Sequence, residues 1–122
     1  MAKTIMIVDD APSVRQVVSM ALRGAGYEVV EASNGKDAVS KLDGRKLNLV
    51  ICDLNMPQMD GLQFLEVIRA QQNYRFTPVI MLTTETADDK KARARSAGAK
   101  AWLTKPFQPS TMLEAVAKVC AP

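Results

Sequence analysis

The chain has 122 residues, 48% of them apolar, which is enough for one buried core and excludes an intrinsically disordered chain. It carries 16 basic and 13 acidic residues but no histidine, which excludes imidazole general-base catalysis and histidine-ligated zinc. No apolar stretch approaches ~18 residues, so we expect no membrane insertion. The first residues lead directly into an apolar run, so we also expect no signal peptide.

Five short apolar runs alternate along the chain with stretches in which apolar residues recur at helical spacing. In chain order, the predicted elements are a strand at 5–8, a helix from Pro12 to about Gly24, a strand at 28–32, a helix at 36–42, a strand at 47–52, a helix around 62–68, a strand at 78–82, a helix at 87–97, a strand at 101–104 and a helix at 110–119. Such apolar runs are typical of strands buried on both faces of a parallel sheet with right-handed crossovers. The pattern predicts a single α/β domain over residues 1–122, with helices on both faces of the sheet.

The predicted helix at 87–97 differs from the others because alanines are its only apolar residues. Large apolar side chains supply most of the free energy that docks a helix, so we expect this helix to be weakly held and able to shift. Six basic residues lie in or near it: Lys90, Lys91, Arg93, Arg95, Lys100 and Lys105. We interpret them as a solvated face, because the chain has no zinc module or interleaved aromatics that would indicate direct nucleic-acid binding.

Polar residues stand where four of the predicted strands end. They are Asp9 and Asp10, Asp53, Thr83, and Lys105. In open α/β sheets, ligands bind beyond the carboxyl ends of the strands, so these side chains should converge at one edge. Three close carboxylates raise one another's pKa values, and a hard cation such as Mg²⁺ relieves that cost. Together with a hydroxyl and an ammonium group, such a site fits the oxygens of a transferring phosphoryl group, and a carboxylate can act as the nucleophile. Asp53 is the best candidate nucleophile, because it stands alone on the central strand.

The combined motifs identify a family. They are Asp9-Asp10 after the first strand, Asp53-Leu54-Asn55-Met56-Pro57 with Asp60-Gly61, Thr83-Thr84 after the fourth strand, and Lys105-Pro106-Phe107 after the fifth. Over its full length the chain resembles the receiver domains of two-component response regulators, in particular chemotaxis regulators of the CheY family. The resemblance implies a flavodoxin-like (βα)5 fold whose parallel strands have the order 2-1-3-4-5.

The resemblance also implies a role for each residue of the site. Asp53 resembles the phosphoacceptor. Asp10 and Asp53 resemble direct Mg²⁺ ligands, Asp9 binds Mg²⁺ directly or through water, and the backbone carbonyl of Asn55 completes the shell. Thr83 and Lys105 resemble the switch hydroxyl and the lysine that contact the phosphoryl oxygens.

Three further residues stand out in the comparison with the family. The family pattern implies a cis peptide bond between Lys105 and Pro106. Thr84 departs from the family, in which a smaller residue, often alanine, is usual at this position, and we expect it to narrow access to the phosphoryl group. Trp102 replaces the tyrosine or phenylalanine that turns inward on activation, so the larger indole puts that inward movement in question.

The function implied is that of a stand-alone response regulator without an output domain. A histidine kinase donates the phosphoryl group, and the surface of the last two helices and the strand between them then controls binding to an output partner, for which a flagellar motor switch is a candidate. A separate phosphatase is a further candidate partner. The protein is expected to catalyse its own phosphorylation and dephosphorylation without being an enzyme in the usual sense. Two widely separated cysteines, Cys52 and Cys120, indicate reduced thiols and a cytoplasmic location.

Alternative functions remain open. The same domain could be an intermediate in a phosphorelay or a phosphate sink. A phosphatase that forms an aspartyl phosphate needs a second aspartate two residues after the nucleophile, where this chain has Asn55. A flavin-binding domain of the same fold class needs a phosphate-binding loop after the first strand, where Asp9 and Asp10 would repel phosphate.

Overall fold

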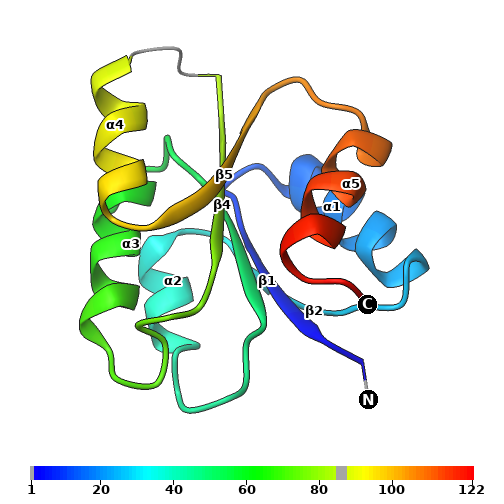
Figure 1. Ribbon diagram of the computed structural model, residues 1–122, viewed down its shortest axis with the longest axis horizontal. Coiled ribbons are helices and arrows are strands. Elements are labelled where there is room, and N and C mark those ends of the chain that lie inside the picture. The colour runs from blue at the N-terminus through cyan, green and yellow to red at the C-terminus, as the bar shows by residue number, and fades with distance from the viewer. Residues whose placement is uncertain (1, 85–87) are drawn as a thin grey trace.

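The computed structural model describes residues 2–84 and 88–122, with all side chains in those ranges except those of residues 88–91. A central sheet lies between two layers of helices, with α2, α3 and α4 on one face and α1 and α5 on the other (Figure 1). In chain order the elements are β1 (Thr4–Val8), α1 (Pro12–Gly24), β2 (Glu28–Ala32), α2 (Gly35–Ser40), β3 (Leu49–Asp53), α3 (Gly61–Ala70), β4 (Val79–Thr83), α4 (Asp88–Ser96), β5 (Ala99–Thr104) and α5 (Pro109–Val119).

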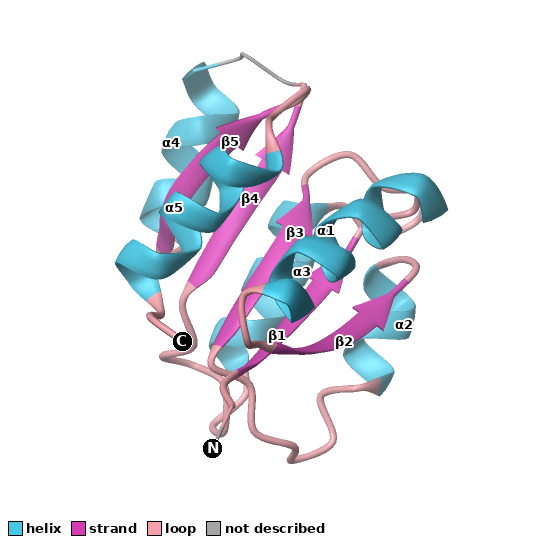
Figure 2. Cartoon of the chain, turned by 90° about the vertical axis from the view of Figure 1, so that its right-hand side faces the viewer, coloured by secondary structure: helices cyan, strands magenta, loops and turns pink. Residues whose placement is uncertain are grey.

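The described strands form one five-stranded parallel sheet in the order β2-β1-β3-β4-β5, which confirms the predicted fold class. Figure 2 shows that the strands run in the same direction, with their carboxyl ends at one edge. All five residues of β3 and all five of β4 are buried, as expected for strands covered on both faces.

The sheet divides the apolar core into two clusters, because successive side chains of a strand point to opposite faces. The cluster under α2, α3 and α4 contains Met6, Val50 and Met81 from the strands and Phe64 from α3. The cluster under α1 and α5 takes the alternate strand residues, including Ile5, Ile51 and Ile80, with Leu22 and Met112 from the helices.

The helix starts have local explanations in the sequence. Pro12 occupies the first turn of α1, where a missing N–H costs nothing. The side chain of Asn34 accepts a hydrogen bond of 2.7 Å from the backbone N–H of Asp37 and caps α2. Asp60 and Gln63 form a reciprocal capping box at the start of α3. These caps fix where the helices begin.

The structure corrects several predicted boundaries. The helix predicted at 36–42 ends at Ser40, and β5 begins at Ala99 rather than at residue 101. The strands predicted at 47–52 and 78–82 instead span Leu49–Asp53 and Val79–Thr83, so each begins later and ends one residue later, and Asp53 and Thr83 are the last residues of β3 and β4. Polarity suggested that the strands end before these residues, but the parallel ladder continues beyond them, because the N–H of Lys105 donates to the carbonyl of Thr83 at 2.8 Å.

The helix predicted at 87–97 is α4, which spans Asp88–Ser96, and residue 87 lies outside the described residues. Of the side chains described in α4, only that of Ala94 is buried. Ala97, just beyond the helix, is partly buried against the same cluster. In its described part, α4 therefore contributes little apolar surface to the core.

Candidate functional site

The carboxyl ends of β1, β3, β4 and β5 bring the predicted site residues to one edge of the sheet. Carboxylate oxygens of Asp9, Asp10 and Asp53 lie within 4.8 Å of one another. Asp9 is fully buried and Asp53 is 4% exposed, whereas Asp10 is exposed. The structure thus places two carboxylates in the protein and one at its surface, around a common point.

Lys105 extends from the end of β5 to both buried carboxylates. Its Nζ lies 2.9 Å from Asp9 Oδ2 and 3.3 Å from Asp53 Oδ2. Burial lowers the pKa of Lys105, but the hydrogen bond to Asp9 and the charges of both carboxylates outweigh it, so the pKa is raised. Lys105 is therefore a fixed cation at the site and not part of a solvated basic face.

The two buried aspartates are held differently. The Oδ1 of Asp9 accepts a hydrogen bond of 2.9 Å from the backbone N–H of Ala11, which orients this carboxylate at the start of α1. Desolvation and the charge of Asp9 raise the pKa of Asp53, and Lys105 offsets this only in part. Ionisation of Asp53 is therefore costly, and a ligand that neutralises its charge relieves that cost.

Asn55 connects Asp53 to Thr83. Its backbone N–H donates to Asp53 Oδ1 at 3.3 Å, and its side-chain amide donates to Thr83 Oγ1 at 3.4 Å. Thr83 is fully buried. The family resemblance implies only a backbone-carbonyl role for Asn55, and the side-chain contact goes beyond it. The available signal was an amide two residues beyond the candidate nucleophile.

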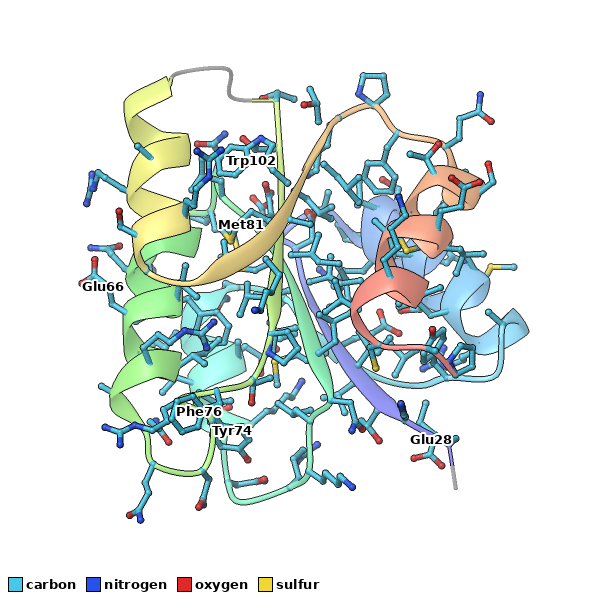
Figure 3. The ribbon with its side chains drawn as sticks, in the orientation of Figure 1. Glu28, Glu66, Tyr74, Phe76, Met81 and Trp102 are labelled. Carbon is cyan, nitrogen blue, oxygen red and sulfur yellow. The ribbon has the colours of Figure 1, made fainter. Side chains whose placement is uncertain are left out.

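The remaining predicted residues lie around this centre. The Lys105–Pro106 peptide bond is cis. Thr84 is exposed and borders a mainly apolar groove together with Lys105 and Pro106. Trp102 lies on the same side of the sheet as α4 (Figure 3) and is partly buried against the cluster under that helix.

The donor set fits a hard divalent cation. Three carboxylate groups with oxygens within 4.8 Å, one of them exposed, form an oxygen-only and incomplete shell. Mg²⁺ prefers such oxygen ligands and retains several waters. The fit is to Mg²⁺ rather than to zinc, because the cluster contains no nitrogen or sulfur ligand.

Comparison with known proteins identifies the class. A family model described as the response regulator receiver domain matches residues 5–117, so the chain belongs to the response regulator receiver domain family. It is a CheY-like receiver domain of a two-component response regulator, and such domains are signalling proteins rather than enzymes in the usual sense.

Relatives from several bacteria support this assignment. The chain is 36% identical over 112 residues to the chemotaxis protein CheY1 of Helicobacter pylori, covering 90% of each chain. It is 33% identical over 112 residues to protein PilG of Pseudomonas aeruginosa, covering 92% of this chain and 83% of PilG. The solved structure of Vibrio cholerae chemotaxis protein CheY4 superposes with a TM-score of 0.93 at 43% identity, covering 98% of this chain and 99% of that one.

Within the described residues, none of the helices is long and apolar enough to cross a membrane.

Proposed function

We propose that Asp53 accepts a phosphoryl group from a phosphohistidine of a histidine kinase, at a site that also binds Mg²⁺. The observation that carries this proposal is the cluster itself. Carboxylates of Asp9, Asp10 and Asp53 lie within 4.8 Å of one another, and Lys105 contacts two of them. Carboxylates this close together raise one another's cost of ionisation, and such clusters of perturbed charges are typical of functional sites.

In the proposed reaction, a carboxylate oxygen of Asp53 attacks phosphorus. A P–O bond forms, the P–N bond to the donor imidazole breaks, and its electron pair stays on the imidazole nitrogen. Asp9, Asp10, Asp53 and the backbone carbonyl of Asn55 would hold Mg²⁺, which when bound neutralises charge on phosphoryl oxygens.

Two further side chains assist in the proposed mechanism. The ammonium group of Lys105 is already directed at Asp53, so it can pair with a phosphoryl oxygen without a large rearrangement. The hydroxyl of Thr83 can donate to another phosphoryl oxygen. In its contact with Asn55, at 3.4 Å, the hydroxyl is the acceptor, so this contact does not use the hydroxyl proton.

The proposed output is a change in the surface formed by α4, β5 and α5, read by a partner protein in the cytoplasm. The domain, taken as the whole of residues 1–122, would act as a stand-alone regulator with self-catalysed phosphorylation and dephosphorylation, with or without a separate phosphatase. The relatives named as chemotaxis proteins make a flagellar motor switch the first output partner to test.

The test is chemical labelling followed by mass spectrometry. Incubation with acetyl phosphate or phosphoramidate and Mg²⁺ should add one phosphate that hydroxylamine removes, and chelation of Mg²⁺ should prevent it. Asp53→Asn should remain unlabelled, while Asp43→Asn, which alters an exposed carboxylate remote from the site, should label fully. Label on another residue, or complete labelling of Asp53→Asn, would falsify the proposal.

A further inference from the structure

Arg69, near the end of α3, donates hydrogen bonds from all three of its guanidinium nitrogens to backbone carbonyls. Nε donates to Ala97 at 3.0 Å, Nη2 to Gly98 at 3.0 Å and Nη1 to Thr77 at 2.7 Å. Ala97 and Gly98 form the turn between α4 and β5, and Thr77 lies just before β4. One side chain thus joins α3, the end of α4 and the start of β4.

This cation is held by carbonyl dipoles. Among the described residues, Arg69 forms no ion pair with a carboxylate. Burial lowers its pKa, as expected for a desolvated cation that lacks a counter-charge. A positive charge at the C-terminal end of a helix is favourable, because the last carbonyls of the helix are unpaired and carry partial negative charge. Arg69 therefore stabilises the C-terminal end of α4.

Gly98 is fitted to this contact. Its φ of +96° favours glycine, and a Cβ at this position would lie 2.9 Å from Arg69 Nε and 3.1 Å from Nη2. The turn is closed by the N–H of Gly98, which donates to the carbonyl of Arg95 at 3.0 Å. The backbone and the guanidinium group thus fix each other at this end of the helix.

The described part of α4 has few other anchors. In the described part of the helix, Ala94 is fully buried, whereas the side chains of Ala92, Arg93 and Arg95 are exposed. A single buried methyl group contributes only about 1 kcal/mol of docking free energy. The two hydrogen bonds from Arg69 to Ala97 and Gly98, which the third bond ties to Thr77, are therefore the main attachment of the described part of α4. They lie at the end away from Thr83, which precedes α4 in the chain.

We infer that Arg69 is the pivot of α4: it holds the C-terminal end of the helix in place while the end nearer the candidate phosphorylation site reorients. Arg69 is thus a positioning residue for the output surface. This inference rests on the proposed function for its signalling role, but the attachment itself exists in the unphosphorylated protein and is testable there.

The first test is amide hydrogen exchange of the unphosphorylated protein. In Arg69→Met, which keeps the length and apolar stem of the side chain, the amides of residues 92–97 should exchange at least tenfold faster, while those of β1 and β3 change less. Arg75→Met is the matched control, since Arg75 is exposed and lies over the ring of Phe76 at 5.9 Å. Arg69→Lys retains a cation that can reach part of the carbonyl cluster and should recover part of the protection. Equal acceleration in α4, β1 and β3, or none in α4, would refute the pivot.

The second test asks whether binding at the site moves α4. Backbone NMR spectra are recorded while Mg²⁺ and beryllofluoride, a phosphoryl mimic, are added. In Arg69→Met, the concentration for half-saturation should stay within twofold of wild type, because no residue that binds the mimic is altered. The changes in NMR chemical shift of the α4 amides on binding should fall to half or less of those in wild type. Arg69→Lys should restore part of these changes. If the α4 amides of Arg69→Met change their chemical shifts as much as those of wild type, the proposed role of Arg69 in signalling is wrong. Failure of the wild-type protein to bind the mimic would count against the proposed function, while the exchange result would still decide the attachment.

Discussion

Replacing Asp53 by asparagine should stabilise the metal-free protein, although it removes the candidate phosphoacceptor. Asparagine is nearly isosteric with aspartate, and its carbonyl oxygen can still accept the hydrogen bond from the N–H of Asn55. Lys105 keeps Asp9 as its partner at 2.9 Å. The substitution therefore removes a charge while preserving the packing.

The magnitude follows from the separations of the charges. At an effective dielectric constant of about 20, like charges at the outer limit of 4.8 Å repel by roughly 3.5 kcal/mol, and opposite charges 3.3 Å apart attract by about 5 kcal/mol. Asp53 faces two carboxylates and one ammonium group, and water screens the exposed Asp10, so these terms nearly cancel. The desolvation of Asp53 then decides the sign, and we expect the variant to be more stable by about 1–3 kcal/mol.

The pH dependence gives a second signature. Burial and the charge of Asp9 raise the pKa of Asp53, so the native state holds this proton more tightly than the unfolded state does. The metal-free wild type should therefore lose stability as pH rises from the unfolded pKa of 3.8 through the raised native pKa, and Asp53→Asn should not show this loss. The advantage of the variant should be absent below that window, grow across it and stay constant above it.

Urea unfolding in the presence of a chelator, between pH 3 and pH 8, measures both effects. Saturating Mg²⁺ should shrink or reverse this difference: a ligand at 100 times its Kd adds about 2.7 kcal/mol to the wild type, whereas the variant lacks one ligand charge and should gain less. Asp43→Asn, at an exposed carboxylate, should show no comparable gain in stability. A chelated variant at neutral pH that is less stable than wild type would refute the account of a strained acid cluster.

Three further outcomes are expected. Gly61→Ala should lower the free energy of unfolding by at least about 2 kcal/mol in urea titrations, because its Cβ would lie 2.6 Å from the carbonyl oxygen of Asp53; an unchanged midpoint would contradict this. Tyr27→Phe should cost about 1–3 kcal/mol, because the tyrosine hydroxyl donates at 2.6 Å to the buried carbonyl of Cys120. Burial raises the pKa of Tyr27, so this contribution should persist below pH 10 and disappear as pH rises through the native pKa, and a difference between the two proteins that is independent of pH would oppose it. Trp102 emission should shift on addition of Mg²⁺ and beryllofluoride, since the indole packs under α4; an unchanged spectrum would mean that the signal leaves by another surface.

Much of the fold could be predicted from the apolar runs alone. The short runs ending at Val8, Asp53 and Thr83 are strands because they are apolar on both faces, and the polar residues that follow mark the edge of the sheet. Periodicity carries no information about which strands are neighbours, so the strand order depended on the resemblance to a family. The point at which a strand ends depends on its ladder partners, and for this reason Asp53 and Thr83 were placed one residue outside strands to which they belong.

The site could be predicted in its membership but not in its contacts. Charge and spacing indicated that Asp9, Asp53 and Lys105 meet. Lys105 forms ion pairs with two carboxylates, and the amide of Asn55 donates to Thr83. These contacts depend on side-chain positions that no local sequence pattern specifies. Arg69 had no signature at all, because its partners are backbone carbonyls contributed by distant turns.

The sheet keeps the two apolar clusters apart, so a core substitution changes the packing mainly on one face of the sheet. Ile5, Ile51 and Leu22 lie on the side of α1 and α5, whereas Phe64 and Ala94 lie on the side of α4, so substitutions in one group should combine additively with substitutions in the other. A lineage that adapts to a new temperature can repack the first group and leave the second untouched. The packing under α1 can thus change while the packing under α4 is kept.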